Sequence, residues 1–242
     1  MQFTIRPATL DDQDSLIEAV IEAEKSGTEI ISYCNIFGLS RNELEQLLRD
    51  ILNEDFGGQE LCIQGFLIAE TDGRFAAAAN AWIECEDETP SRIIKANLLH
   101  HFLGNDRLKE ARKHFAILAG LNFEREPGAI QLESIYVRPE FRGLGLTQRL
   151  LNEHISILRR RQPLISKAQI ILTADNRLAL RAYQKLGFDI VDTRTVLAAE
   201  LGDLLPHNCK YLMRSNSRRH KICQHKTHTL STKRNSCPLT PR

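Results

Sequence analysis

The sequence has no long apolar run, no export signal and no closely paired cysteines. Its longest apolar stretches fall far short of the roughly 20 residues that a membrane-spanning helix requires, so we expect no such helix. The first residues lack a basic segment followed by an apolar one, and we therefore expect a cytoplasmic protein. None of the six cysteines forms a Cys-x-x-Cys pair, which favours reduced thiols over disulfides.

Acidic residues are missing from the carboxyl-terminal part of the chain. From residue 214 to the end there are eight Lys or Arg and no Asp or Glu, whereas residues 1–213 contain 24 basic and 31 acidic residues. These counts leave a net charge of −7 on residues 1–213, which is not typical of a nucleic-acid-binding protein. The composition of residues 215–242 predicts a disordered basic tail, and any interpretation as a nucleic-acid binder rests on this tail alone.

Histidine and cysteine are present, but their spacing is not that of a metal site. The Cys-x-His-x-x-His pattern near the carboxyl terminus is not a standard zinc spacing. The histidines within residues 86–127 have no cysteine or carboxylate at ligand spacing. We therefore predict no metal ion at either set, which comprises His100, His101 and His114 in the first segment and Cys223, His225, His228 and Cys237 in the second.

The composition is that of an ordinary globular domain, with 42% hydrophobic and 26% charged residues. A single α/β domain over residues 1–214 is the leading prediction. Strand-like segments alternate with amphipathic helical segments along the first part of the chain. The strands are expected at residues 3–6, 61–70 and 75–85, the last two joined by an Asp-Gly turn, and the helices at residues 9–25 and from the capping box at 40–43 to residue 51.

The stretch from residue 131 to residue 151 reads as a strand, a tight turn and a helix. Pro139 cannot donate to a strand ladder, and Gly143 and Gly145 permit backbone angles that a Cβ would forbid. The start of the helix has free N–H groups and a positive dipole end, and Arg142 adds a full positive charge. The turn therefore predicts a phosphate site, although Gly-x-Gly alone is equally typical of a simple chain reversal.

A second stretch, residues 168–188, reads as an apolar strand and a capped helix that ends at a Gly-Phe pair. Together the two stretches resemble the GCN5-related N-acetyltransferase (GNAT) superfamily. Its coenzyme A motif, Arg/Gln-x-x-Gly-x-Gly/Ala after a strand, corresponds to residues 142–147. Thr147 departs from this motif, because the family usually has Gly or Ala there, and this departure bears on cofactor affinity. The second motif of the family corresponds to Asn176, Tyr183, Gly187 and Phe188.

The resemblance implies a GNAT fold, with a mixed and mostly antiparallel sheet of six or seven strands flanked by helices. Residues 189–197 and 210–214 are the expected last strands. Residues 86–127 carry helical spacing at 91–102 and 106–121 and are expected as a helical insertion between strands three and four. Three roles fit this insertion near the acceptor end of the site: shaping substrate choice, acting as a lid, or forming a homodimer contact.

The resemblance also implies an acetyltransferase that uses acetyl-coenzyme A and no metal. An acetyl group would pass from the thioester to a primary amine by direct attack in a ternary complex, with Tyr183 as the general acid and the oxyanion near the backbone N–H of Ile135. Asn176 would bond the pantetheine arm. The implied coenzyme A-binding residues are Ile135, Tyr136, Val137, Arg142, Gly143, Leu144, Gly145, Leu146, Thr147, Asn176 and Tyr183.

The general base and the acceptor are less defined. Glu133, on the strand of the motif, is the first candidate base and Glu84 the second, although both also fit as surface carboxylates. By resemblance Tyr33 and Phe37 contact the acceptor, although core packing explains them equally well. Small amines, amino acids, antibiotics and protein amines all remain open, and the acidic domain favours a cationic acceptor. The alternative is a non-catalytic GNAT-fold protein that binds acyl-coenzyme A or scaffolds a partner.

Overall fold

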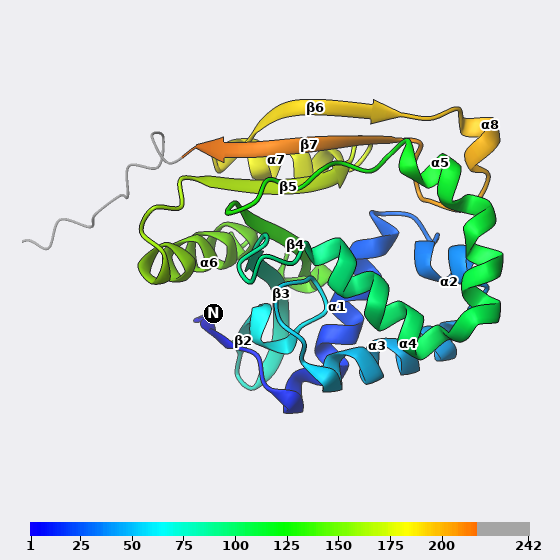
Figure 1. Cartoon of the computed structure of the whole chain (residues 1–242). Helices are drawn as coiled ribbons and strands as arrows, with labels where there is room; N and C mark the ends of the chain where they lie inside the picture. The colour runs from blue at the N-terminus through cyan, green and yellow to red at the C-terminus, as the bar shows by residue number, and fades with distance from the viewer. Residues whose placement is uncertain (217–242) are drawn as a thin grey trace, which may run out of the picture.

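A seven-stranded sheet organises residues 1–216, the part of the chain that the computed structural model describes (Figure 1). The strand order is β1-β2-β3-β4-β5-β7-β6, and every neighbouring pair is antiparallel except β4 and β5. The mixed, mostly antiparallel sheet expected from the sequence is therefore confirmed. The strands are β1 (Thr4–Pro7), β2 (Phe66–Thr71), β3 (Arg74–Ile83), β4 (Ile130–Val137), β5 (Lys167–Thr173), β6 (Asp189–Thr195) and β7 (Cys209–Asn216).

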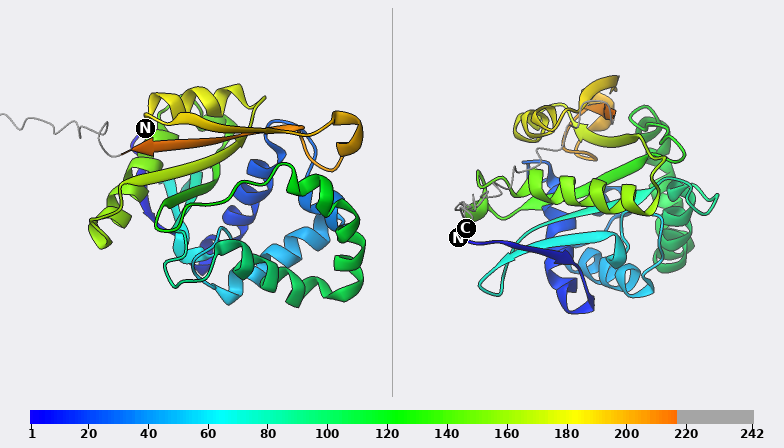
Figure 2. Two further views of the ribbon diagram at one scale, coloured as in Figure 1. Left: turned by 45° about the horizontal axis from the view of Figure 1, so that its top comes forward. Right: turned by 90° about the vertical axis from the view of Figure 1, so that its left-hand side faces the viewer.

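Helices cover both faces of the sheet, as the views in Figures 1 and 2 show. One core lies between the sheet and α1 (Gln13–Lys25), α2 (Ser32–Phe37), α3 (Arg41–Glu54) and α4 (Ser91–Ala111). The other core lies under α6 (Leu146–Arg161) and α7 (Arg177–Lys185). The shorter helices are η1 (Leu10–Asp12), η2 (Ile63–Gly65), η3 (Arg112–His114), α5 (Phe115–Ala119), η4 (Pro139–Phe141) and α8 (Ala198–Leu201). Among the helices of residues 1–216, none has the length and apolar character needed to cross a membrane.

The alanine run of β3 lets helices approach the middle of the sheet closely. Residues 76–79 are fully buried, and their side chains divide between the two cores. On the α6 side, His154 Nε2 lies 2.8 Å from the backbone oxygen of Ala79, so α6 lies directly against this strand. Burial lowers the pKa of His154 to about 4, so the ring is neutral at pH 7 and donates this hydrogen bond.

The segment between β3 and β4 is helical, but its helices end at other residues than predicted. The backbone breaks at Gly104, which has a φ of 72° and a ψ of 174°, and helical geometry then continues to Ala111. The predicted second helix, over residues 106–121, corresponds to the part of α4 after Gly104, then η3 and the short helix α5, which ends at Ala119. A small apolar cluster then joins the residues after α5 to α8 and the loop that follows it. Its buried members are Leu121, Leu201 and Leu205.

The carboxyl-terminal strand is longer than the sequence suggested. The predicted tail began at residue 215, but β7 continues to Asn216 because Ser215 and Asn216 still pair with Ala168 and Lys167 of β5. Residues 217–242 lie outside the described residues. The prediction of a disordered tail and the cysteines and histidines considered there as zinc ligands therefore stay untested.

Candidate active site

A cleft opens in the sheet where β4 and β5 separate. The two strands pair only over Ile130–Leu132 and Ala168–Ile170, although both continue beyond these residues. From Glu133 onward, the edge of β4 that faces β5 has no strand partner within residues 1–216. The resulting cavity has a volume of about 730 Å³ and is lined by β4, β5, α1, α6 and α7. Its open strand edge can accept an extended ligand that contains amide groups.

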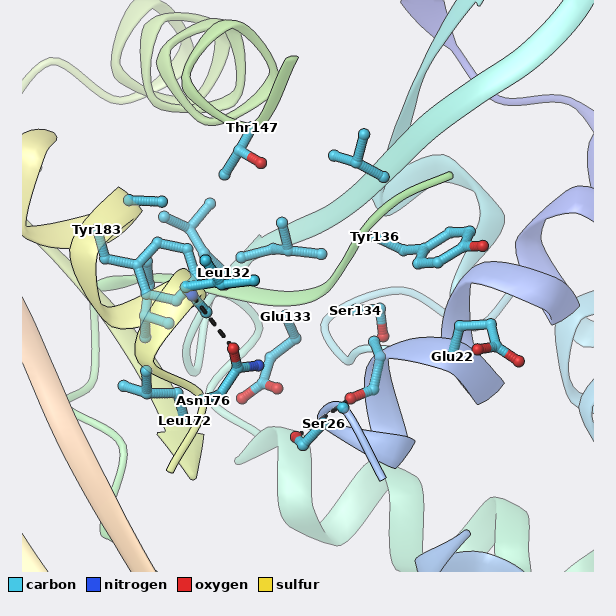
Figure 3. A pocket seen from close by; sticks show the side chains of 18 of the residues that line it. Glu22, Ser26, Leu132, Glu133, Ser134, Tyr136, Thr147, Leu172, Asn176 and Tyr183 are labelled. Carbon is cyan, nitrogen blue, oxygen red and sulfur yellow. Dashed lines mark hydrogen bonds between the residues drawn. The ribbon is translucent and has the colours of Figure 1, made fainter. Parts of the chain in front are cut away.

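A bulge in β4 reshapes the backbone at the centre of this cleft. Asn80 of β3 pairs with Glu133, but Ala78 pairs with Tyr136, so Ser134 and Ile135 together stand opposite one residue. Ser134 has a positive φ of 50°, which is uncommon for a residue with a Cβ. Bulges of this kind leave a residue outside the regular ladder and redirect its backbone groups. Figure 3 shows Glu133 and Ser134 side by side in the cleft.

The glycine turn and the start of α6 form one end of the cleft. Gly143 and Gly145 have φ values of 79° and 76°, and a Cβ on either would meet no heavy atom within 4 Å among the described residues. The backbone angle therefore favours glycine at both positions, and the space in front of them is left open. Gly145 is the N-cap of α6, so the next three N–H groups have no carbonyl partner within the helix. This end is suited to an anion, and Arg142 lines it.

Helix α7 contributes a polar and an aromatic group to the same cleft. Asn176 is the N-cap of α7, and its side-chain oxygen accepts a hydrogen bond of 3.1 Å from the backbone N–H of Ala179 (Figure 3). The amide NH₂ of Asn176 remains available to a ligand. Tyr183 lies seven residues further along the helix, and its side chain is buried against the apolar cleft wall. Burial raises the pKa of Tyr183, with a further contribution from Glu133, so the hydroxyl keeps its proton.

A buried group of alternating charges stands behind Glu133. Arg125 donates to Glu133 at 2.9 Å and lies 3.7 Å from Glu60, while Lys95 of α4 donates to Glu60 at 2.6 Å. The Arg125 guanidinium also stacks over Trp82, 4.9 Å from the ring centre. Burial alone would raise the pKa of Glu60, but Lys95 and Arg125 hold it below its usual value. For Glu133, burial raises the pKa against the opposing effect of Arg125.

Comparison with known proteins supports the assignment of the glycine turn and of the α7 segment to GNAT motifs. The acetyltransferase (GNAT) family profile matches residues 32–188 of the sequence. The chain belongs to the GNAT family. The search of the curated proteins found no match to this sequence.

Solved GNAT structures share the fold of this chain at low sequence identity. A crystal structure described as an acetyltransferase is 21% identical, with a TM-score of 0.57 over 88% of this chain and 99% of that one. An N-acetyltransferase from Staphylococcus aureus Mu50 is 16% identical, with a TM-score of 0.59 over 87% and 99% of the two chains. An agmatine N-acetyltransferase is also 16% identical, with a TM-score of 0.52 over 89% and 100%. These similarities support the GNAT fold and do not indicate the acceptor.

Most of the residues predicted to bind coenzyme A are brought together by this GNAT fold. The cleft is lined by every one of them except Leu144, whose side chain is half exposed outside the cleft. Tyr136 lines it through β4, although its hydroxyl is engaged with Glu18 of α1. Thr147 faces the cleft from the first turn of α6, opposite Glu133 in Figure 3.

The predicted catalytic and acceptor residues divide into two groups. Tyr183, Glu133 and Tyr33 line the same cleft. Glu84 does not, because it is buried at the end of β3, where it accepts from Trp82 Nε1 at 3.0 Å and from the backbone N–H of Ser91 at 2.9 Å. Both of its oxygens therefore hold β3 and the start of α4.

Phe37 is also separate from the cleft. It is buried in the core beneath α1, α3 and α4, where its ring lies 6.0 Å from that of Tyr33. The structure thus places Phe37 as packing behind Tyr33.

Several charged residues of the cleft were not predicted. Glu24 and Glu60 line it, and Lys95 and Arg125 neutralise its carboxylates. These residues lie on α1, on α4 and in two loops, and no local motif joins them. No group of three or more His, Cys, Asp or Glu side chains within residues 1–216 is arranged to hold a metal ion.

Proposed function

We propose that this GNAT protein transfers an acetyl group from acetyl-coenzyme A to a primary amine in a ternary complex. The observation that carries the proposal is the continuous lining of one cleft. It joins the glycine turn at the start of α6 to Tyr183 and Glu133. One ligand lying in this cleft would thus contact an anion site, an open strand edge and two proton-transfer groups.

Acetyl-coenzyme A fits the groups that the cleft offers. Its diphosphate would accept hydrogen bonds from the free N–H groups of Leu146 and Thr147, with Arg142 supplying positive charge. The pantetheine amides would pair with the backbone of Ile135 and Val137 on the open edge of β4. Asn176 would donate through its amide NH₂, because its oxygen is occupied by the helix cap.

In the reaction, Glu133 would accept a proton and Tyr183 would donate one. Glu133 would take a proton from the acceptor ammonium or attacking amine, either directly or through water, and the amine nitrogen would bond to the thioester carbonyl carbon. A backbone N–H near Ile135 would stabilise the oxyanion. As the carbon–sulfur bond breaks, Tyr183 would donate its proton to the leaving thiolate, since its raised pKa keeps the hydroxyl protonated.

Thiol release in the presence of an amine panel tests this proposal directly. The full chain is incubated with acetyl-coenzyme A and with monoamines, diamines, amino acids and peptides, and free coenzyme A is measured with a thiol reagent. We expect release that depends on an amine and rises above the rate without one. Tight binding of coenzyme A with no release for any amine would contradict turnover and favour the non-catalytic alternative.

A further inference from the structure

One carboxylate of the cleft forms no salt bridge with any residue of the described part of the chain. Three of the cleft's glutamates are paired, namely Glu22 with Lys25 at 2.9 Å, Glu60 with Lys95 at 2.6 Å and Glu133 with Arg125 at 2.9 Å. Glu24, on the last turn of α1, lines the same cleft and makes no salt bridge within residues 1–216. It hydrogen-bonds to Ser32, and the ammonium groups of Lys95 and Lys210 act on it only from a distance. Burial raises the pKa of Glu24, because the carboxylate is withdrawn from water.

A buried tyrosine hydroxyl accompanies this carboxylate. Tyr33 is only 7% exposed and lines the cleft. Its hydroxyl has no hydrogen-bond partner within 3.5 Å in the described part of the chain, and the nearby Lys95 ammonium, which is paired with Glu60, acts on it from beyond that distance. Buried hydroxyls normally have a partner, so an unpartnered one beside a cavity points to a ligand group. A phenolic oxygen accepts a hydrogen bond from an ammonium group. Glu24 and Tyr33 therefore offer the charge and the acceptor that a cation requires.

The wall of the cavity is partly apolar where α1 and the loop before β2 form it. Val20 and Ala23 of α1 and Leu61, which lies in the loop before β2, line the same cavity. Such a wall suits methylene groups rather than a charged or strongly polar chain. Figure 3 places Ser26 and Glu22 of the α1 segment across the cleft from Tyr183, with Glu133 between them. A slender ligand can thus reach from Glu133 towards the end of α1.

We propose that the acceptor is a small aliphatic diamine or polyamine, with one amine at Glu133 and a second ammonium group bound by Glu24 and Tyr33. This inference rests on the proposed acetyl transfer, because it names the acceptor of that reaction. A monoamine would leave the Glu24 carboxylate unpaired, whereas a diamine would pair both ends. The structure therefore favours dications over monoamines of equal length.

Direct binding measurements separate this inference from the proposed reaction. Titration calorimetry is done on the full chain saturated with coenzyme A. It compares each α,ω-diamine from diaminopropane to diaminohexane with the monoamine of the same chain length, from propylamine to hexylamine. We expect at least one diamine to bind about 10-fold or more tightly than its matched monoamine, the effect of one charge-assisted hydrogen bond. An absence of preference for every diamine would overturn the inference. A lack of thiol release with any amine would instead refute the proposed reaction and leave this comparison valid.

Matched variants locate the second ammonium. Glu24→Gln should reduce the ratio of monoamine to diamine dissociation constants to near one, and Tyr33→Phe should reduce it in the same direction. Glu29→Gln is the control, because Glu29 follows the same helix but its side chain is 93% exposed, and this variant should keep the wild-type ratio. Urea unfolding checks that each variant is folded. If Glu24→Gln does not fold, the dissociation-constant ratio of Tyr33→Phe decides the question. A wild-type ratio in a folded Glu24→Gln protein would refute the assignment.

Discussion

Replacing Gly145 by alanine separates the backbone role of the glycine turn from its role in binding. Gly145 has a φ of 76°, and a Cβ built there meets no atom of residues 1–216 within 4 Å. The stability cost therefore comes only from holding an L-residue in the left-handed region, about 1–2 kcal/mol. A protein of this size should remain folded after such a loss. Gly145 lines the cleft directly before the free N–H groups of α6, so we expect the added methyl group to interfere with an anion bound there.

The expected effect on coenzyme A binding is larger than the effect on stability. If the Cβ prevents one charge-assisted hydrogen bond from a backbone N–H to the diphosphate, the binding energy falls by about 1.5–3 kcal/mol. This loss corresponds to a dissociation constant roughly 10- to 150-fold weaker. Titration calorimetry with coenzyme A measures the affinity, and urea unfolding measures the stability.

Gly73→Ala provides the matched control. Gly73 lies in the turn between β2 and β3, has a φ of 71°, and likewise has no atom within 4 Å of a built Cβ. It does not line the cleft. Both variants should lose a similar free energy of unfolding, but only Gly145→Ala should lose affinity. Equal, wild-type-like affinity in the two variants would refute the phosphate role of the turn.

Three further predictions concern the proton-transfer groups and a buried histidine. Tyr183→Phe keeps the ring packing and should lower kcat by about 10²-fold or more while changing the KM for acetyl-coenzyme A much less; an unaltered kcat would remove the hydroxyl from the mechanism. Glu133→Gln should lower kcat and abolish the acidic limb of the pH–rate profile. In the wild type that limb should lie above pH 4.5, because burial raises the pKa of Glu133; an identical limb in both proteins would assign it elsewhere. Burial lowers the pKa of His154 from 6.5 to about 4. As the pH falls below 6.5, the imidazole is therefore protonated in the unfolded chain but stays neutral in the folded one. Stability should thus fall by about 2 kcal/mol between neutral pH and pH 5, by urea unfolding, and His154→Gln should reduce this dependence; an unchanged slope would contradict it.

The proposed coenzyme A side of the cleft was predictable because its signals are local. A strand, a Gly-x-Gly turn and a helix start are adjacent in the chain, and the backbone angles of Gly143 and Gly145 depend on the residue type itself. Asn176 and Tyr183 are seven residues apart on one helix, so their common face follows from helical geometry. These short-range relations led from the sequence to the same cleft that the fold forms.

The acceptor side was not predictable in the same way. Glu84 lies near the end of a predicted strand, where a catalytic carboxylate could also lie, yet the tertiary fold uses both of its oxygens to hold Trp82 and the start of α4. Glu60 and Lys95 are 35 positions apart and meet only because α4 packs beside the loop before β2. No periodicity or motif in the sequence predicts this contact, because ion pairs between distant segments depend on how those segments pack.

The sequence by itself determined the GNAT family, the position of the glycine turn and the residues that face the cleft from α7. It could do so because hydrophobic spacing and special backbone angles act within a few residues of each other. Only the tertiary structure decided which carboxylates form salt bridges and that Glu24 has none with a residue of 1–216. The charge state of a buried site depends on every segment packed around it, and those segments are brought together only when the chain folds.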